Sequence, residues 1–336
     1  MTHDDYLWDG SGRPDPDVQR LERMLAPHRY RPARPKRIGM PLRLVAGLAA
    51  AAVLLLVWQY ALRPEVQDVV SGWRVEALTG APCLAATAIG QVVDASKGEW
   101  LVTDDTSAAV IWVSDIGKVR VAPNSRLQVV ATDSTNHRLK LERGTLHVSI
   151  WAPPRLFFVE TPAAVAVDLG CIYTITVDRD GNGTLCVESG WVALERDGRE
   201  SLIPEGALCD LRAGVGPGTP YLAGASLDYL DYLKRYDLDP GTGEDLDRLI
   251  HEAGVCDVFS LVYLLPRVPH EARSRIFDRV SSFVPPWPGI TRDGIVDLDL
   301  AMVEEWQDQF ACFELEPCRA TCDAALPRVR APTEPL

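Results

Sequence analysis

The sequence predicts a mainly β protein with one transmembrane helix and a small α-helical region near its C-terminus. Three observations lead to this prediction. One run of 19 residues carries no charge, a long stretch after it has apolar residues at every second position, and the last third has apolar residues at helical spacing. We expect the β part to be an antiparallel sandwich or roll, or a β-solenoid-like fold, because alternation alone does not choose among them.

The composition limits the class of protein. The chain has 336 residues, of which 47% are hydrophobic, so it is not wholly disordered. Its formal net charge is −13. Proteins that bind nucleic acids usually present a basic field, so this acidic balance argues against a nucleic-acid partner.

Changes of pattern divide the chain into seven segments. They are a cytoplasmic arm (1–43), a transmembrane helix (44–62), a linker (63–71), an exported β-domain (72–212), a Gly/Pro linker (213–226), a helical region (227–311) and a Cys/Pro-rich tail (312–336).

The uncharged run from Leu44 to Leu62 is long enough to cross a bilayer, which needs about 20 residues at about 1.5 Å each. A buried helix of a soluble domain and a cleaved signal peptide are the alternatives. Signal peptides begin within the first few residues, whereas 43 residues precede this run, so we expect an uncleaved signal-anchor. The expected membrane anchor flanks are Arg43, Trp58, Tyr60 and Arg63.

The charges beside this run predict its orientation. Six basic residues and no acidic residue lie between Arg29 and Arg43, and basic residues collect on the cytoplasmic side of a membrane. Residues 1–43 hold 9 basic and 6 acidic residues, which leaves 25 basic and 41 acidic residues, a net charge of −16, for the rest of the chain. We therefore expect the N-terminus in the cytoplasm and the bulk of the chain outside it.

The β-domain shows period-two apolar spacing with many β-branched residues. Turn residues separate the alternating runs, among them Pro123-Asn124-Ser125, Arg143-Gly144 and Asp180-Gly181. The clearest strand-rich runs are 118–130, 138–150, 156–177 and 184–195.

The order of several short pieces in this region resembles the FecR domain family. The pieces are DIGKVRVAPNSRLQVV (115–130), LERGTLHV (141–148), FFVETP (157–162), VAVDLGCIYTITV (165–177), VESGWVAL (187–194) and LIPEGALC (202–209). The resemblance implies a bacterial inner-membrane regulator with a cytoplasmic anti-sigma segment, one transmembrane helix and a periplasmic domain that receives a signal. Here the C-terminus has a helical pattern instead of the family's small α/β domain, and the cytoplasmic arm is short.

The cytoplasmic arm contains a predicted amphipathic helix over 17–26. Its apolar face is a candidate partner face for a sigma factor, or the helix lies on anionic headgroups of the lipid bilayer. Gly47 and Ala51 have the spacing of a transmembrane dimer contact, so a homodimer is an open alternative. On the periplasmic side the expected partner is an envelope protein or a glycan. The candidate partner face consists of Val18, Leu21 and Leu25.

All eight cysteines follow the predicted membrane helix, where disulfides can form and persist. We predict a disulfide between Cys171 and Cys209, because each follows a glycine-containing turn and the two could face each other across strands. In the tail we expect a disulfide within the trio Cys312, Cys318 and Cys322, or from that trio to Cys256. Three thiols without a nearby histidine make a poor zinc site.

No motif in the sequence predicts catalysis. HExxH, GxSxG and Walker patterns are missing, and the Asp178–Gly183 stretch has Ser189 where a calcium loop needs a glutamate. We therefore expect no enzyme activity, no catalytic residues, no cofactor and no metal. The sequence predicts a membrane-anchored regulator that senses a periplasmic signal and controls a sigma factor through its arm. The alternative is a membrane-tethered binding or scaffold protein without a transcriptional role.

Overall fold

The computed structural model describes residues 73–239, 243–312 and 318. The predictions for the cytoplasmic arm, the transmembrane helix and the first linker lie outside these residues, and so do their candidate residues Arg43, Trp58, Tyr60, Arg63, Val18, Leu21 and Leu25. Within the described ranges, no helix combines the length and apolar character that a membrane crossing requires.

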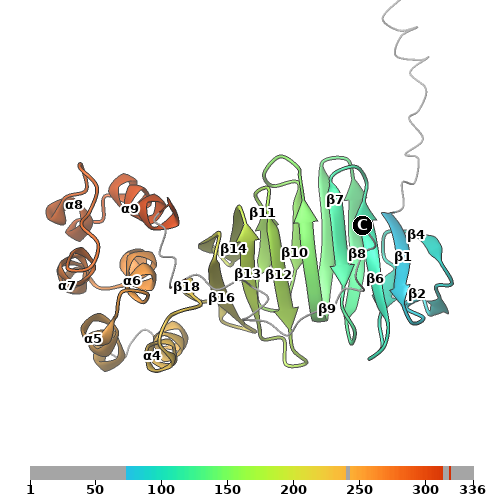
Figure 1. The fold of residues 1–336 in the computed structure, drawn as a ribbon, viewed down its shortest axis with the longest axis horizontal. Helices are drawn as coiled ribbons and strands as arrows, with labels where there is room; N and C mark the ends of the chain where they lie inside the picture. Colours follow the sequence, from blue (N-terminus) through green and yellow to red (C-terminus); the bar gives the residue numbers. More distant parts are fainter. Residues whose placement is uncertain (1–72, 240–242, 313–317, 319–336) are drawn as a thin grey trace, which may run out of the picture. The chain divides into compact units, whose positions relative to one another are not determined.

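The described part of the chain begins with eighteen strands and continues with helices (Figure 1). This confirms a mainly β fold with a small helical region after it. The strands are β1 Trp73–Thr79, β2 Cys83–Leu84, β3 Thr87–Ala88, β4 Val92–Ala95, β5 Trp100–Val102, β6 Ala108–Val113, β7 Gly117–Val121, β8 Arg126–Asp133, β9 Asn136–Ile150, β10 Phe157–Glu160, β11 Val165–Asp168, β12 Ile172–Val177, β13 Gly183–Ser189, β14 Trp191–Arg196, β15 Arg199–Pro204, β16 Ala207–Arg212, β17 Gly216–Pro217 and β18 Tyr221–Leu222.

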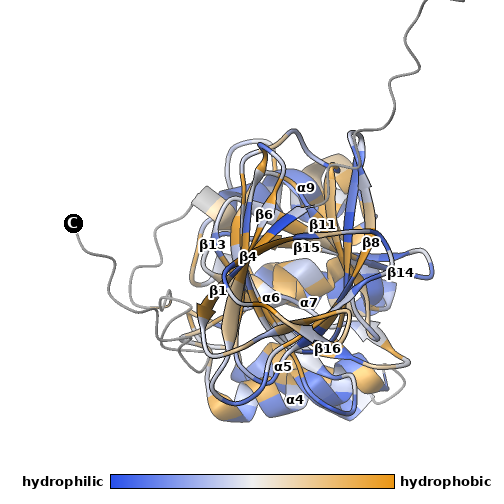
Figure 2. Ribbon diagram, turned by 90° about the vertical axis from the view of Figure 1, so that its right-hand side faces the viewer, coloured by the Kyte–Doolittle hydropathy of each residue, from blue (hydrophilic) through white to orange (hydrophobic). Residues whose placement is uncertain are grey.

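The strands form two sheets with a shared core. Sheet A has the order β4-β1-β6-β7-β9-β12-β13-β16, and β17 and β18 pair with β16. Sheet B has the order β3-β2-β5-β8-β9-β10-β11-β14-β15. Figure 2 shows β1, β4, β6 and β13 on one side of the molecule and β8 and β14 on the other. The pairing is antiparallel, as predicted, except between β9 and β10, which run parallel.

Side-chain alternation produces the core between the sheets. In β12, Tyr173, Ile175 and Val177 are buried while the residues between them are partly exposed, and β8 repeats the pattern with Leu127 and Val129. Successive side chains of a strand point to opposite faces, so each strand turns one apolar row toward the facing sheet.

The predicted turn at Arg143-Gly144 is wrong, because β9 runs through it. Residues 136–143 of β9 pair with β8 in sheet B, and residues 144–150 pair with β7 and β12 in sheet A. Gly144 has φ +107°, and a Cβ atom there would lie 2.4 Å from Ser125 Cα. The glycine therefore lets the strand bend from one sheet into the other instead of ending it.

The predicted Gly/Pro linker 213–226 is also partly wrong, because it contains β17 and β18. Both strands are buried and pair with β16, Gly216 opposite Arg212 and Tyr221 opposite Leu208. This segment therefore extends sheet A and does not act as a linker between two separate domains.

The helices follow from Leu227, after Ser226 caps the first one by accepting a hydrogen bond from Tyr229 N. Their bounds are α4 Leu227–Leu238, α5 Gly243–Glu252, α6 Val258–Leu264, the 3₁₀ helix η2 Leu265–Arg267, α7 His270–Ser281, α8 Arg292–Val296 and α9 Leu300–Cys312. Every residue of α6 is buried. The buried residues of strands and helices form one apolar cluster, so the helical region packs on the β-domain.

Candidate functional site: the junction of strands and helices

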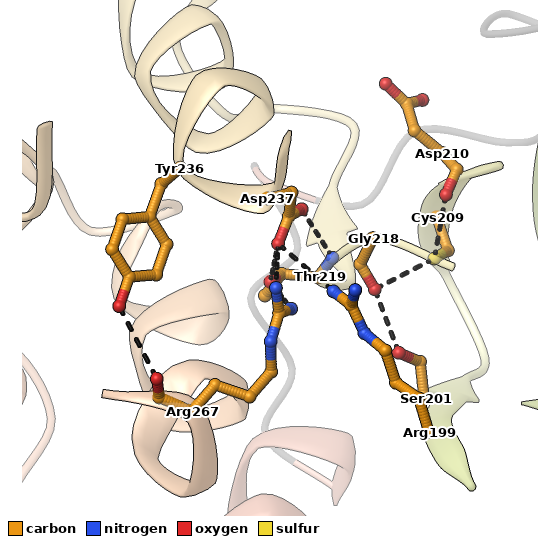
Figure 3. Close-up of polar contacts among 9 residues, drawn as sticks. All are labelled: Arg199, Ser201, Cys209, Asp210, Gly218, Thr219, Tyr236, Asp237 and Arg267. Carbon is orange, nitrogen blue, oxygen red and sulfur yellow. Dashed lines mark hydrogen bonds and ion pairs between the residues drawn. The ribbon is translucent and has the colours of Figure 1, made fainter. Parts of the chain in front are cut away.

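A polar cluster lies where α4 and η2 meet β15 and the loop between β17 and β18 (Figure 3). Asp237, near the end of α4, is its centre. Three further residues complete the junction cluster, namely Arg199 at the start of β15, Thr219 in the loop and Arg267 in η2.

Asp237 binds both strands and helices through its two carboxylate oxygens. Thr219 donates to it twice, from N to Oδ2 at 2.7 Å and from Oγ1 to Oδ1 at 2.8 Å. Arg267 Nη2 lies 2.7 Å from Oδ1, and Arg267 Nη1 donates to Thr219 Oγ1 at 2.7 Å. With its side chain only 12% exposed, Asp237 is held in a single geometry by charge-assisted bonds.

The second guanidinium is less well satisfied. Arg199 Nη2 lies 3.9 Å from Asp237 Oδ1, and its Nε and Nη2 atoms are buried without a hydrogen-bond acceptor. Burial and repulsion from Arg267 lower the pKa of Arg199, and the attraction of Asp237 opposes this. Two cations therefore share one anion, which makes Asp237 the residue on which the cluster depends.

A second carboxylate adds to the same junction. Asp210 on β16 accepts hydrogen bonds from Tyr221 at 2.9 Å and Thr184 at 3.2 Å, and its Oδ2 lies 3.2 Å from Lys234 Nζ on α4. Helix α4 is thus joined to the β-domain at both Lys234 and Asp237.

The nearby thiol does not add reactivity. Cys209 is buried and donates to Gly218 O at 3.4 Å, while Ser201 donates to the same oxygen at 2.9 Å. Burial, followed by the charges of Asp237 and Asp210, raises the pKa of Cys209 well above its usual value. A thiol that stays protonated is a poor nucleophile and metal ligand. The described residues also contain no group of three His, Cys, Asp or Glu side chains placed to hold a metal ion.

The predicted disulfide between Cys171 and Cys209 is wrong, because both thiols are free and buried. Cys171 precedes β12 and Cys209 lies on β16, and β13 runs between these strands in sheet A. Two strand spacings are about 10 Å, beyond the Cα separation of about 7 Å that a disulfide allows.

The other cysteine prediction is confirmed in one of its two forms. Cys318 of the tail forms a disulfide with Cys256, with a Cα–Cα distance of 5.4 Å. Cys318 O also accepts a hydrogen bond from Gly224 N at 2.9 Å, so this point of the tail is fixed beside the end of the β-domain. The side chains of Cys312 and Cys322 lie outside the part of the chain that the structure describes.

Sequence analysis did not find the junction cluster. Its contacting pairs are 18 to 48 residues apart, from Thr219 with Asp237 to Thr219 with Arg267, so no local spacing marks them. Thr219 also lies in a segment predicted to be a linker. The one available clue was an aspartate directly after the buried Tyr236 on the apolar side of α4.

Comparison with known proteins finds a family match within the β-domain. One family model matches residues 100–193, which run from β5 to β14. The match is to the FecR protein family. It confirms the resemblance predicted from the sequence, and we call residues 100–193 the FecR segment below. The junction cluster begins just after it, at Arg199.

Two crystal structures of a "putative anti-sigma factor" from Parabacteroides distasonis ATCC 8503, at 1.65 and 2.50 Å resolution, are similar to part of this chain. Each aligns with 35% of this chain and 56% of that one, at 15% sequence identity and a TM-score of 0.31. This chain therefore spans little more than half of that protein's length, and the likeness is too low to carry an argument. No curated protein matches the chain.

Proposed function

We propose that this protein is a membrane-anchored, non-enzymatic regulator of the FecR type, with its β-domain and helical region outside the cytoplasm. The observation that carries the proposal is the family match over the FecR segment. The predicted signal-anchor at 44–62 supports the membrane attachment. The cluster of basic residues from Arg29 to Arg43 before it supports the orientation.

The Cys256–Cys318 disulfide supports an exported location. Structural disulfides persist in oxidising compartments and are rare in the cytoplasm.

On the cytoplasmic side, we propose that the arm contacts a sigma factor through Val18, Leu21 and Leu25. On the exported side, the helical region would meet the signalling partner. The bonds of Asp237 and Lys234 to the β-domain would then couple that event to the FecR segment.

The sigma factor contact is tested by co-purification of the full chain from its host membranes, with each sigma factor of the host detected by mass spectrometry. We expect one sigma factor with the natural chain and its loss with Leu21→Glu. The matched control Arg23→Gln, on the opposite face of the predicted helix, should retain it. A natural chain that is exported normally and recovers no sigma factor would favour the tethered scaffold instead.

The orientation is tested separately by C-terminal fusions of alkaline phosphatase, which is active only outside the cytoplasm, and of a fluorescent protein that folds only inside it. We expect phosphatase activity alone. A fluorescent fusion protein together with an inactive phosphatase fusion would contradict the proposed orientation.

A further inference from the structure

A carboxyl group lies buried between the two sheets of the FecR segment. Asp168 is the last residue of β11 and is 1% exposed. It lies two residues after the core residue Ala166 and pairs across the strands with the core residue Val192, so its side chain points inward.

The polar partners of this carboxyl are weak or neutral donors. Gly170 N donates to Oδ1 at 2.8 Å, and the thiol of Cys171 donates to Oδ2 at 3.0 Å. The hydroxyl of Tyr173, which is fully buried nearby and interacts electrostatically with Asp168, has no hydrogen-bond partner. These three ionisable side chains make up the buried cluster Asp168, Cys171 and Tyr173.

Charged side chains of the adjoining elements are engaged elsewhere. Arg155 donates to Asp168 only from its backbone, to the carbonyl oxygen at 2.8 Å, and its guanidinium binds Glu195 of β14 at 2.8 Å and lies 3.7 Å from Glu200 of β15. Other contacts of these elements include Arg138 of β9 with Glu160 of β10 at 3.0 Å, His147 of β9 with Glu188 of β13 at 3.3 Å, and Arg196 of β14 with Asp197 at 3.2 Å.

An ionised carboxylate in this position is costly because it lacks a counter-ion. Burial raises the pKa of Asp168 to about 6, and the hydrogen bonds from Cys171 and Gly170 only partly oppose it. Burial and the nearby Asp168 also raise the pKa of Cys171 beyond its ordinary range. The thiol therefore stays a neutral donor and is no redox centre.

We propose that Asp168 is a proton-binding site inside the FecR segment, and that release of its proton loosens the turn between β11 and β12. This turn carries the chain from sheet B to sheet A, and Cys171 O accepts a hydrogen bond from Ile150 N of β9 at 3.1 Å. Opening the turn would hydrate the carboxylate and weaken the contact between the sheets. The exported domain would thereby respond to pH. This response does not depend on whether a sigma factor is the target.

The sign of the effect follows from linkage. The folded-state pKa of about 6 lies above the ordinary value of 3.8, so the folded protein holds the proton more tightly. The stabilisation is complete below about pH 4 and is lost as the pH rises through 6. The full loss corresponds to about a hundredfold in the folding constant, of which about tenfold falls between pH 5 and pH 7.

The test compares urea unfolding of the full chain and its Asp168→Asn variant between pH 5 and pH 7. We expect the ratio of the natural folding constant to that of the variant to fall about tenfold over this range. The matched control is Asp104→Asn. Hydrogen bonds from Ser107 and Thr106 lower the pKa of Asp104 to about 2, so it stays ionised throughout, and its ratio to the natural chain should not change with pH. An unchanged ratio for Asp168→Asn would overturn the proposal.

Two measurements on the natural chain keep the test decisive if Asp168→Asn does not fold. Carboxyl NMR of labelled aspartate should show one group titrating near pH 6. Hydrogen exchange of the amides from Gly170 to Ile172, corrected for its intrinsic pH dependence, should be faster at pH 7 than at pH 5. The proposal fails if the carboxyl resonance assigned to Asp168 does not titrate above pH 5, or if exchange at this turn is the same at both pH values.

Discussion

Two aspartates of this protein, the partly buried Asp237 and the fully buried Asp168, have opposite surroundings. Asp237 lies beside the guanidinium groups of Arg199 and Arg267 and accepts two hydrogen bonds from Thr219. Asp168 has the backbone amides of Gly170 and Cys171 and the Cys171 thiol. Burial without a counter-ion disfavours the ionised carboxylate of Asp168, so we assign it a proton-binding role, whereas Asp237, which joins α4 to the β-domain, has a structural role.

At the residue scale we predict that Asp237→Asn lowers the free energy of unfolding by about 2 kcal/mol, measured in urea at pH 7. The change removes the only anion between two partly buried cations, which then repel each other. The control Asp231→Asn, on the same helix, breaks an exposed pair with Arg235 and should cost less than about 0.5 kcal/mol.

A second substitution separates charge repulsion from lost packing. In the Asp237→Asn background, Arg199→Met removes one of the two cations and should restore part of the lost stability. If it instead adds a further independent loss, the two arginines do not repel each other in the way described here.

At the scale of elements, β9 is the strand that joins the two sheets. Its first half pairs with β8 and β10, and its second half pairs with β7 and β12. Such a crossing needs a sharp bend without loss of hydrogen bonds, and Gly144 lies at the bend. The fold therefore depends on one glycine more than on any surface turn.

We predict that Gly144→Ala lowers the free energy of unfolding by about 3 kcal/mol or more, because its Cβ would lie 2.4 Å from Ser125 Cα. Gly198→Ala is the matched control. Gly198 also has positive φ, +79°, but no atom lies within 4 Å of its added Cβ, so only backbone strain of about 1 kcal/mol is expected. Equal losses in urea unfolding would show that the close approach to Ser125 does not matter.

At the scale of the whole molecule, strands and helices belong to one folding unit. Their buried side chains form a single apolar cluster within one compact unit. The Cys256–Cys318 disulfide then closes a loop of 62 residues around the helical region. We expect far-UV signals of strand and helix to be lost in one transition.

We predict that replacing both Cys256 and Cys318 by serine lowers the free energy of unfolding by up to about 4 kcal/mol, because the unfolded chain regains the entropy of that loop. Denaturant unfolding without reductant measures the change. The control Cys83→Ser, at a free and partly exposed thiol, should have little effect. A non-reducing peptide map without a linked Cys256–Cys318 pair would contradict the prediction.

Several features were predictable from local pattern. The period-two runs marked the strands because a half-buried strand repeats every two residues, and the helical spacing after Leu227 marked α4 for the same kind of reason. The order of the strand pieces also predicted the FecR match over residues 100–193. The bond from the tail to Cys256 was one of two alternatives that cysteine placement left open.

Other features depend on which distant segments meet, and no local spacing records that. Arg143-Gly144 has the sequence pattern of a turn. Only the pairing of β9 with sheet B before Gly144 and with sheet A from Gly144 onward shows that the strand continues through it. Cys171 and Cys209 have similar local settings, yet β13 separates them. Asp168 and Asp237 look like ordinary aspartates until folding surrounds one with apolar side chains and the other with cations.

The sequence by itself determined the class of structure and the likeness to the FecR family, because both depend on the order of nearby residues. Only the tertiary structure decided how the strands pair into sheets, which cysteines pair and which carboxyl group is buried without a counter-ion. Those properties depend on distance and burial between residues far apart in the chain, and such quantities exist only once the chain is folded.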